Sequence, residues 1–122
     1  MKHLLPALFL VVTPAIAHAD PLEDACRAVL KTFLMKPDVN VGVSQTFPNL
    51  VPAGARMSFS DRPATDPAEM SDVIDCQFEK PGKPFGLQRF CISSTCYSND
   101  EQNGDRRRRF EEVKSIVDQQ MK

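Results

Sequence analysis

Histidine is nearly absent from this sequence. The only two, His3 and His18, lie within the first nineteen of the 122 residues. Histidine is the usual general base of enzymes and the usual activator of serine and cysteine nucleophiles. If those first residues are removed after synthesis, the remaining chain has no histidine at all. We therefore expect no catalytic residues and no enzyme activity.

The first nineteen residues have the features of a secretory signal peptide. Lys2 supplies a positive charge, and the apolar run Leu4–Ile16 that follows is too short for a permanent membrane anchor. Cleavage after Ala17 or after Ala19 fits the small-residue rule. We favour Ala19, because Asp20 then begins the mature chain directly before a helix start. No cysteine lies at either position, so we expect no lipid attachment and an exported protein, periplasmic or extracellular.

No second run is apolar enough to cross a membrane, and the chain carries little net charge. It has 15 basic and 16 acidic side chains, and loss of Lys2 leaves 14 against 16, a formal charge of −2. A near-neutral chain gives no electrostatic reason to expect a nucleic acid partner or an anionic membrane surface as a partner. The remaining residues, 20–122, are enough for one small domain and not for two.

Residues 20–36 have the signals of an amphipathic helix. Asp20 can cap it, Pro21 suits the first helical position, and Pro37 should end it near Met35. Five apolar side chains recur at helical spacing and define one buried face: Leu22, Cys26, Val29, Leu30 and Phe33.

The next region, about 37–72, is rich in proline and predicts irregular loops. Residues 55–60 are the best strand candidate within it, because apolar and polar side chains alternate there. Residues 39–43 are a weaker candidate for a short edge strand, with their valines at every second position.

Residues 71–79 and 87–93 predict two antiparallel strands joined by a turn longer than two residues. The C-terminal stretch predicts a second helix from an apolar stripe: Phe110, Val113, Val117 and Met121. This helix could begin near Asn99, with a capping box from Ser98 to Glu101, or at Asp105. The expected fold is a small α+β domain: an N-terminal helix, two to three antiparallel strands and a C-terminal helix, stapled by two disulfides.

The exported chain keeps four cysteines, Cys26, Cys76, Cys91 and Cys96. An even number in a small secreted domain predicts two disulfide bonds. Alternate residues of a strand point to opposite faces of the sheet, and we call this strand parity. It favours Cys26–Cys76 and Cys91–Cys96, because Cys76 shares the core face with the nearby phenylalanines and Cys91 points to the opposite face. The local pair requires a turn, so the second strand should end near Ile92. Pairing of Cys76 with Cys91 stays open, since a symmetric hairpin would set them opposite one another.

Other uses of these cysteines fit the spacing less well. Redox-active pairs are typically Cys-x-x-Cys at a helix start, where the dipole lowers a thiol pKa. Cys91 and Cys96 are instead separated by four residues of strand-like character. A structural zinc site needs four ligands, commonly in two close pairs, whereas Cys26 and Cys76 are isolated. We therefore expect no metal and no cofactor.

The remaining unusual feature is a run of four arginines: Arg106, Arg107, Arg108 and Arg109. With the exposed loop expected over Val51–Met70, the run is a candidate patch for an anionic partner. On a helix the four side chains point in different directions and can pair with Glu111 and Glu112, so a solvated helix surface is the competing interpretation. Cations at a helix N-terminus oppose the dipole, and a start near Asn99 would remove that cost.

These features predict a small exported protein of the cell envelope that binds a partner or has a structural role, without catalytic machinery of its own. An acidic envelope protein, a secreted enzyme or an anionic glycolipid would match the arginine run. The alternative is a small secreted enzyme or redox accessory that uses Cys91 and Cys96.

Overall fold

The computed structural model describes residues 20–122, so the expected signal peptide and both cleavage positions lie outside the described residues. The elements in chain order are α1 (Pro21–Leu34), β1 (Asn40–Phe47), β2 (Ala53–Ser60), the short 3-10 helix η1 (Pro67–Glu69), β3 (Asp72–Phe78), β4 (Leu87–Ile92), β5 (Thr95–Ser98) and α2 (Gly104–Gln120). The strands form one antiparallel sheet in the order β1-β2-β3-β4-β5. The predicted α+β class with two helices and two disulfides is confirmed.

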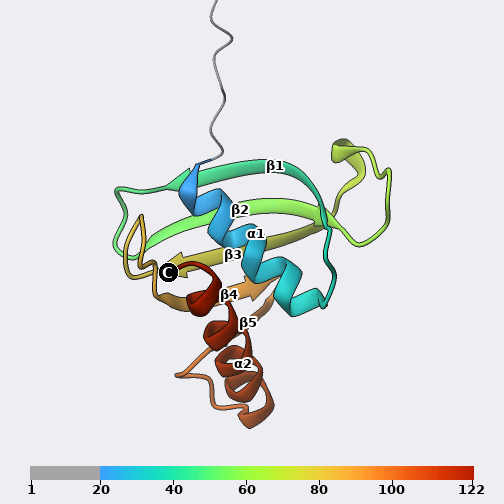
Figure 1. The fold of residues 1–122 in the computed structure, drawn as a ribbon. Helices are drawn as coiled ribbons and strands as arrows, with labels where there is room; N and C mark the ends of the chain where they lie inside the picture. The colour runs from blue at the N-terminus through green and yellow to red at the C-terminus, as the bar shows by residue number, and fades with distance from the viewer. Residues whose placement is uncertain (1–19) are drawn as a thin grey trace, which may run out of the picture.

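Both helices cover the same face of the sheet. Figure 1 shows α1 crossing in front of β1, β2 and β3, while α2 lies over β4 and β5. The buried face of α1 is the predicted one, with Leu22, Cys26, Val29 and Leu30 inaccessible to solvent. It meets core side chains from the middle strands, such as Met57 of β2. The opposite face of the sheet is polar, and Arg56 and Asp75 form an ion pair of 3.7 Å there.

The predicted number of strands, two to three, is wrong, because the sheet has five. The prolines of region 37–72 lie between the strands rather than within them: Pro37 precedes β1, Pro48 and Pro52 lie in the β1–β2 loop, and Pro63 lies beyond β2. Proline that ends a strand leaves its hydrogen-bond ladder intact. Residues 40–60 therefore form a hairpin, and the irregular part of the region is the connection 61–71, which contains η1.

Strand β1 is an edge strand, as predicted for residues 39–43, but it is longer than predicted and a bulge breaks its alternation. The pairing with β2 shifts register between Val41 and Ser44. Val41 packs against the core, whereas Val43 is 64 % exposed. In a regular strand, residues two apart share one face. The bulge places these two valines in different environments, so their spacing misled the prediction.

The disulfides in the structure are Cys26–Cys76 and Cys91–Cys96. Cys26 and Cys76 are buried and join α1 to β3 through the core. Cys91 and Cys96 are direct partners across β4 and β5, with Cα atoms 4.0 Å apart. Strand β4 ends at Ile92, and Ser93 then takes a positive φ of 53° in the two-residue turn to β5. Two-residue hairpin turns need such a φ value.

Helix α2 begins at Gly104 with Asn103 as its N-cap, close to the later of the two predicted starts. The start near Asn99 is therefore wrong, and all four arginines lie in the first two turns. The cost of placing cations there is offset by acceptors from the preceding loop: Arg107 donates to the carbonyl oxygens of Glu101 and Gln102 at 2.6 and 3.1 Å.

Replacing Asn103 with alanine should lower the free energy of unfolding by about 1 kcal/mol. The amides of Asp105 and Arg106 would lose an acceptor that lies 3.0 and 3.2 Å away. Urea unfolding measures the change, and Asn99→Ala is the matched control, expected to shift stability by less than about 0.5 kcal/mol. If the helix began near Asn99, alanine at position 103 would instead stabilise the protein.

Candidate groove between the two helices

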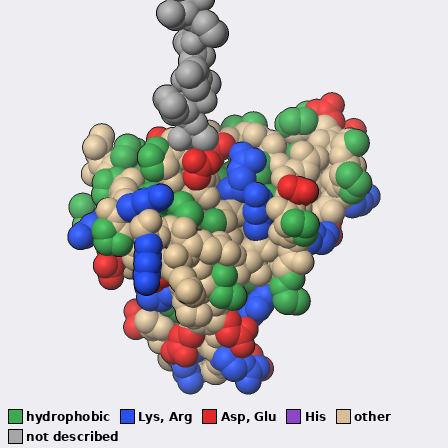
Figure 2. All heavy atoms as spheres, in the orientation of Figure 1, with side chains coloured by type: hydrophobic (Ala, Val, Ile, Leu, Met, Phe, Trp, Pro, Cys, Tyr) green, Lys and Arg blue, Asp and Glu red, His purple; other side chains and the backbone are tan. Residues whose placement is uncertain are grey.

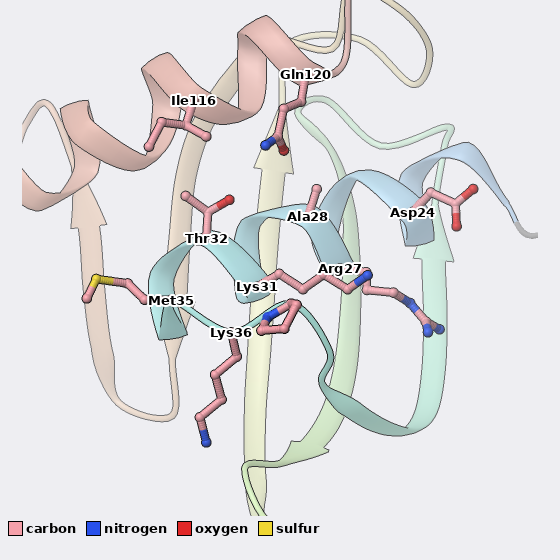
Figure 3. A pocket seen from close by; sticks show the side chains of 10 residues that line it. Asp24, Arg27, Ala28, Lys31, Thr32, Met35, Lys36, Ile116 and Gln120 are labelled. Atoms are coloured by element: carbon pink, nitrogen blue, oxygen red, sulfur yellow. The ribbon is translucent and has the colours of Figure 1, made fainter.

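An open groove runs along the outer side of α1 beside α2. Its volume is about 690 Å³. Figure 3 shows Ile116 and Gln120 of α2 above it and Ala28 and Thr32 of α1 pointing toward them. The complete lining is Asp24, Arg27, Ala28, Lys31, Thr32, Met35, Lys36, Pro37, Ile116 and Gln120.

The groove contains two apolar side chains that the core leaves uncovered. Met35 is 77 % exposed and Ile116 is 45 % exposed. Met35 is the C-cap of α1, with a left-handed φ of 55° and an amide that bonds back to the last turn. This geometry turns the chain off the helix axis. The side chain at the cap therefore leaves the buried stripe that the preceding residues follow.

Three cations form the side of the groove that lies away from α2. Figure 3 places Arg27, Lys31 and Lys36 along this side, and Figure 2 shows basic side chains over α1 on the same face. Arg27 is paired with Glu23 at 3.2 Å. Lys36 donates to a neutral acceptor, the carbonyl oxygen of Asp61, at 3.2 Å.

The charge of this groove is only partly neutralised. Within residues 20–122, no carboxylate lies within ion-pair distance of Lys31 or Lys36. Asp24 is the only acidic residue among those that line the groove. The groove thus combines apolar contact surface with an excess of positive charge, which is a combination that favours an amphipathic anionic ligand.

The sequence interpretation did not identify this groove. Arg27 and Lys31 lie outside the apolar face predicted for the first helix, and their spacing of four residues is common on solvated helices. The groove exists because α2 packs beside α1 and places Ile116 next to these two cations. No local pattern in the sequence could have shown that contact.

The arginine run lies outside the groove, and much of its charge is matched within the domain. Arg106 pairs with Glu101 at 3.4 Å, Arg108 with Asp105 at 3.1 Å and Arg109 with Glu112 at 3.2 Å. The run is nevertheless a surface feature, since Arg108 is 71 % exposed. Its use as an anionic-partner patch stays a prediction.

Arg109 also has a packing role. Its guanidinium lies over the ring of Phe33, 5.1 Å from the centroid, and donates to the Phe33 carbonyl oxygen. That carbonyl belongs to the last turn of α1, where the helix dipole favours a cation. Arg109 therefore ties the start of α2 to the end of α1, and it positions the two helices that form the groove.

The loop expected over Val51–Met70 is not one surface. Residues 53–60 form β2, in the interior of the sheet. Val51 and Pro52 lie in the β1–β2 turn at one end of β2, and the connection from Asp61 to Met70 projects at the other end. Figure 1 shows that connection at the end of β2 and β3, whereas the arginine run begins α2 beside β5. The structure does not bring the two parts of the predicted patch together.

The local disulfide lies on the sheet face opposite the helices. Cys91 pairs in register with Asp75, which is on the polar face, and both cysteines of the bond are half-buried. All four cysteines of the chain are bonded. The bond joins two strands rather than preceding a helix, so a helix dipole does not act on it as in the common redox motif.

Two further observations concern the described part of the chain. Residues 20–122 contain no helix with the length and apolar character needed to cross a membrane. The same residues contain no cluster of three or more histidine, cysteine or acidic side chains arranged to hold a metal ion.

The chain was compared with protein-family models, with curated proteins and with solved structures, and none of them matches it.

Proposed function

We propose that the protein is an exported, disulfide-stabilised binding protein of the cell envelope, and that its groove holds an acidic, amphipathic segment of a partner protein. The observation that carries the proposal is the lining of the groove. The lining contains three cations, Arg27, Lys31 and Lys36, and a single acidic residue, Asp24, together with exposed apolar side chains. Such a surface binds through apolar contact while its charges select the partner.

The groove favours binding over catalysis. Its only hydroxyl belongs to Thr32 and its only carboxylate to Asp24. Eight residues separate them on α1, which corresponds to about 12 Å along the helix axis. A nucleophile and its base must lie within about 3 Å of each other. These two groups therefore do not form a catalytic pair.

The spacing of the cations favours a helical segment as the ligand. Side chains four residues apart on a helix lie about 6 Å from one another, so Arg27 and Lys31 match carboxylates spaced in the same way on a partner helix. The apolar side of that helix would cover Met35 and Ile116, which are already exposed. An acidic envelope protein or a secreted enzyme could supply this segment, whereas an anionic glycolipid has acyl chains for the apolar contact but carries its charges in a headgroup rather than at the spacing of a helix.

The test is site-specific cross-linking in the producing cell. A photo-reactive residue at Ala28 should capture a protein through an acidic peptide, and mass spectrometry identifies that peptide. Lys31→Glu with Lys36→Glu should weaken binding of the purified partner by about a hundredfold, equal to about 2.7 kcal/mol, because both charges become repulsive.

The matched control makes the same change of charge in the arginine run. Arg107→Glu with Arg108→Glu should leave partner binding unchanged, because neither residue lines the groove. If this control lost binding while Lys31→Glu with Lys36→Glu kept it, the partner would bind at the arginine run and not in the groove. Capture of lipid in place of peptide would refute the proposal.

A further inference from the structure

The β1–β2 hairpin tip, residues 47–52, exposes apolar side chains at one end of the sheet. Val51 is 98 % exposed, Leu50 is 60 % exposed and Phe47 is 36 % exposed. The amide of Leu50 bonds to the carbonyl oxygen of Phe47, so these side chains belong to one closed turn. Exposed apolar residues are common singly, but a contiguous group on a projecting turn indicates an interaction site.

Two lysines extend from the neighbouring turn at the same end. Ala53 of β2 pairs with Phe78 of β3, so the β1–β2 and β3–β4 turns lie side by side, as Figure 1 shows. The β3–β4 turn carries Lys80 and Lys83, both exposed. Glu79, the acid that precedes these lysines in the chain, lies back over Gly86, where an added Cβ would come within 2.8 Å of its carboxylate.

The chain before α1 joins the domain at this end as well. The hydroxyl of Thr46 donates to Oδ2 of Asp20 at 2.9 Å, directly beside the start of the tip. Asp20, the first described residue, therefore lies beside the tip.

We propose that the hairpin tip is a membrane-docking element. Phe47, Leu50 and Val51 enter the headgroup region of an anionic phospholipid bilayer, and Lys80 and Lys83 lie against its phosphates. A convex tip suits a deformable bilayer better than a rigid protein surface, because it has little area with which to make complementary contacts. Lysines near an anionic surface add attraction that weakens with salt. This surface is separate from the groove and would hold the groove near the envelope.

Fluorescence offers a direct test, because the chain contains no tryptophan. Leu50→Trp introduces a single fluorophore at the tip, and Val43→Trp introduces one at an exposed site of the same hairpin outside it. The protein is purified from the producing cells and mixed with vesicles of phosphatidylglycerol and phosphatidylcholine. Emission from position 50 should shift to the blue and be quenched by lipids with brominated acyl chains. Emission from position 43 should not change.

Co-sedimentation with the same vesicles measures the affinity. Leu50→Ser with Val51→Ser should lower the partition coefficient by at least about tenfold, whereas Val43→Ser should not change it. Lys80→Gln with Lys83→Gln should lower it by about tenfold on anionic vesicles and leave it unchanged on pure phosphatidylcholine. All of these positions are exposed, and unchanged near-ultraviolet dichroism confirms that the variants fold.

Three results would overturn the proposal. The first is that the unaltered protein does not bind anionic vesicles. The second is that Leu50→Ser with Val51→Ser binds them as strongly as the unaltered protein does. The third is that Lys31→Glu with Lys36→Glu abolishes vesicle binding while Leu50→Ser with Val51→Ser does not. That result would place the lipid in the groove. A groove that fails to bind peptide leaves the vesicle results unaffected, so the two proposals fail independently.

Discussion

Replacing Cys26 and Cys76 together with alanine should lower the free energy of unfolding by about 4 kcal/mol. The bond closes a loop with a sequence separation of 50 residues, and its loss enlarges the unfolded ensemble. A small domain is stable by only about 5–15 kcal/mol, so the change removes a large fraction of the total. The midpoint of thermal unfolding should fall by roughly 15–30 °C. Alanine is the substitution of choice because both sulfurs are buried and a hydroxyl there would need a partner.

The Cys91–Cys96 bond supplies the matched control. Its sequence separation is 5, and the same relation gives a loss of about 2 kcal/mol for Cys91→Ala with Cys96→Ala. Urea unfolding of both variants, each with its remaining bond verified by mass spectrometry, measures the difference. Equal losses in the two variants would contradict the dependence on loop length.

Replacing Phe90 with alanine should cost about 3–5 kcal/mol. Phe90 is inaccessible to solvent and joins three elements through aromatic contacts. Its ring centroid lies 5.6 Å from Phe33 of α1, 4.9 Å from Tyr97 of β5 and 6.2 Å from Phe110 of α2. Removing the ring leaves a cavity that the surrounding side chains fill only in part.

Two further variants make this result specific. Phe90→Leu keeps most of the volume and should lose roughly 1 kcal/mol. Phe47→Ala removes a phenylalanine from the exposed hairpin tip and should change stability by less than about 0.5 kcal/mol. Urea unfolding near the temperature of maximum stability, about 10–20 °C, keeps the alanine variant folded enough to measure. A loss below about 1 kcal/mol for Phe90→Ala would show that the aromatic cluster is not the centre of the core.

Local signals predicted α1 and the parity of β3 and β4. Asp20 caps the helix through the amide of Leu22 at 2.9 Å, and Met35 ends it, as the sequence indicated. The observed disulfide pairing is the one that parity favoured, because alternation places Cys76 on the core face and Cys91 on the other. Caps, prolines and alternation act over a few residues, which is why they can be recognised without the rest of the chain.

Strand β1, which the sequence predicts only weakly and too short, and β5, which it does not predict, have weak or interrupted local signals. The bulge in β1 breaks the alternation around Val43, and the prolines near the hairpin favour loops. Strand β5 has only four residues, Thr95–Ser98, and is defined by its pairing with β4. A short edge strand gains its hydrogen bonds from a partner, so its own composition carries little information.

Local patterns in the sequence predict which face of α1 is buried, how the cysteines divide between the two faces of the sheet and which residues end the helix. Only the packing of the elements places Ile116 beside α1, with Lys31 and Lys36 along one side of the groove. The order of the strands likewise places the two lysines of the β3–β4 turn next to the apolar β1–β2 hairpin tip. The reason is the sequence separation over which the two kinds of contact act. Periodicity records how each residue meets its immediate neighbours, whereas both surfaces arise where elements distant in sequence pack on one sheet.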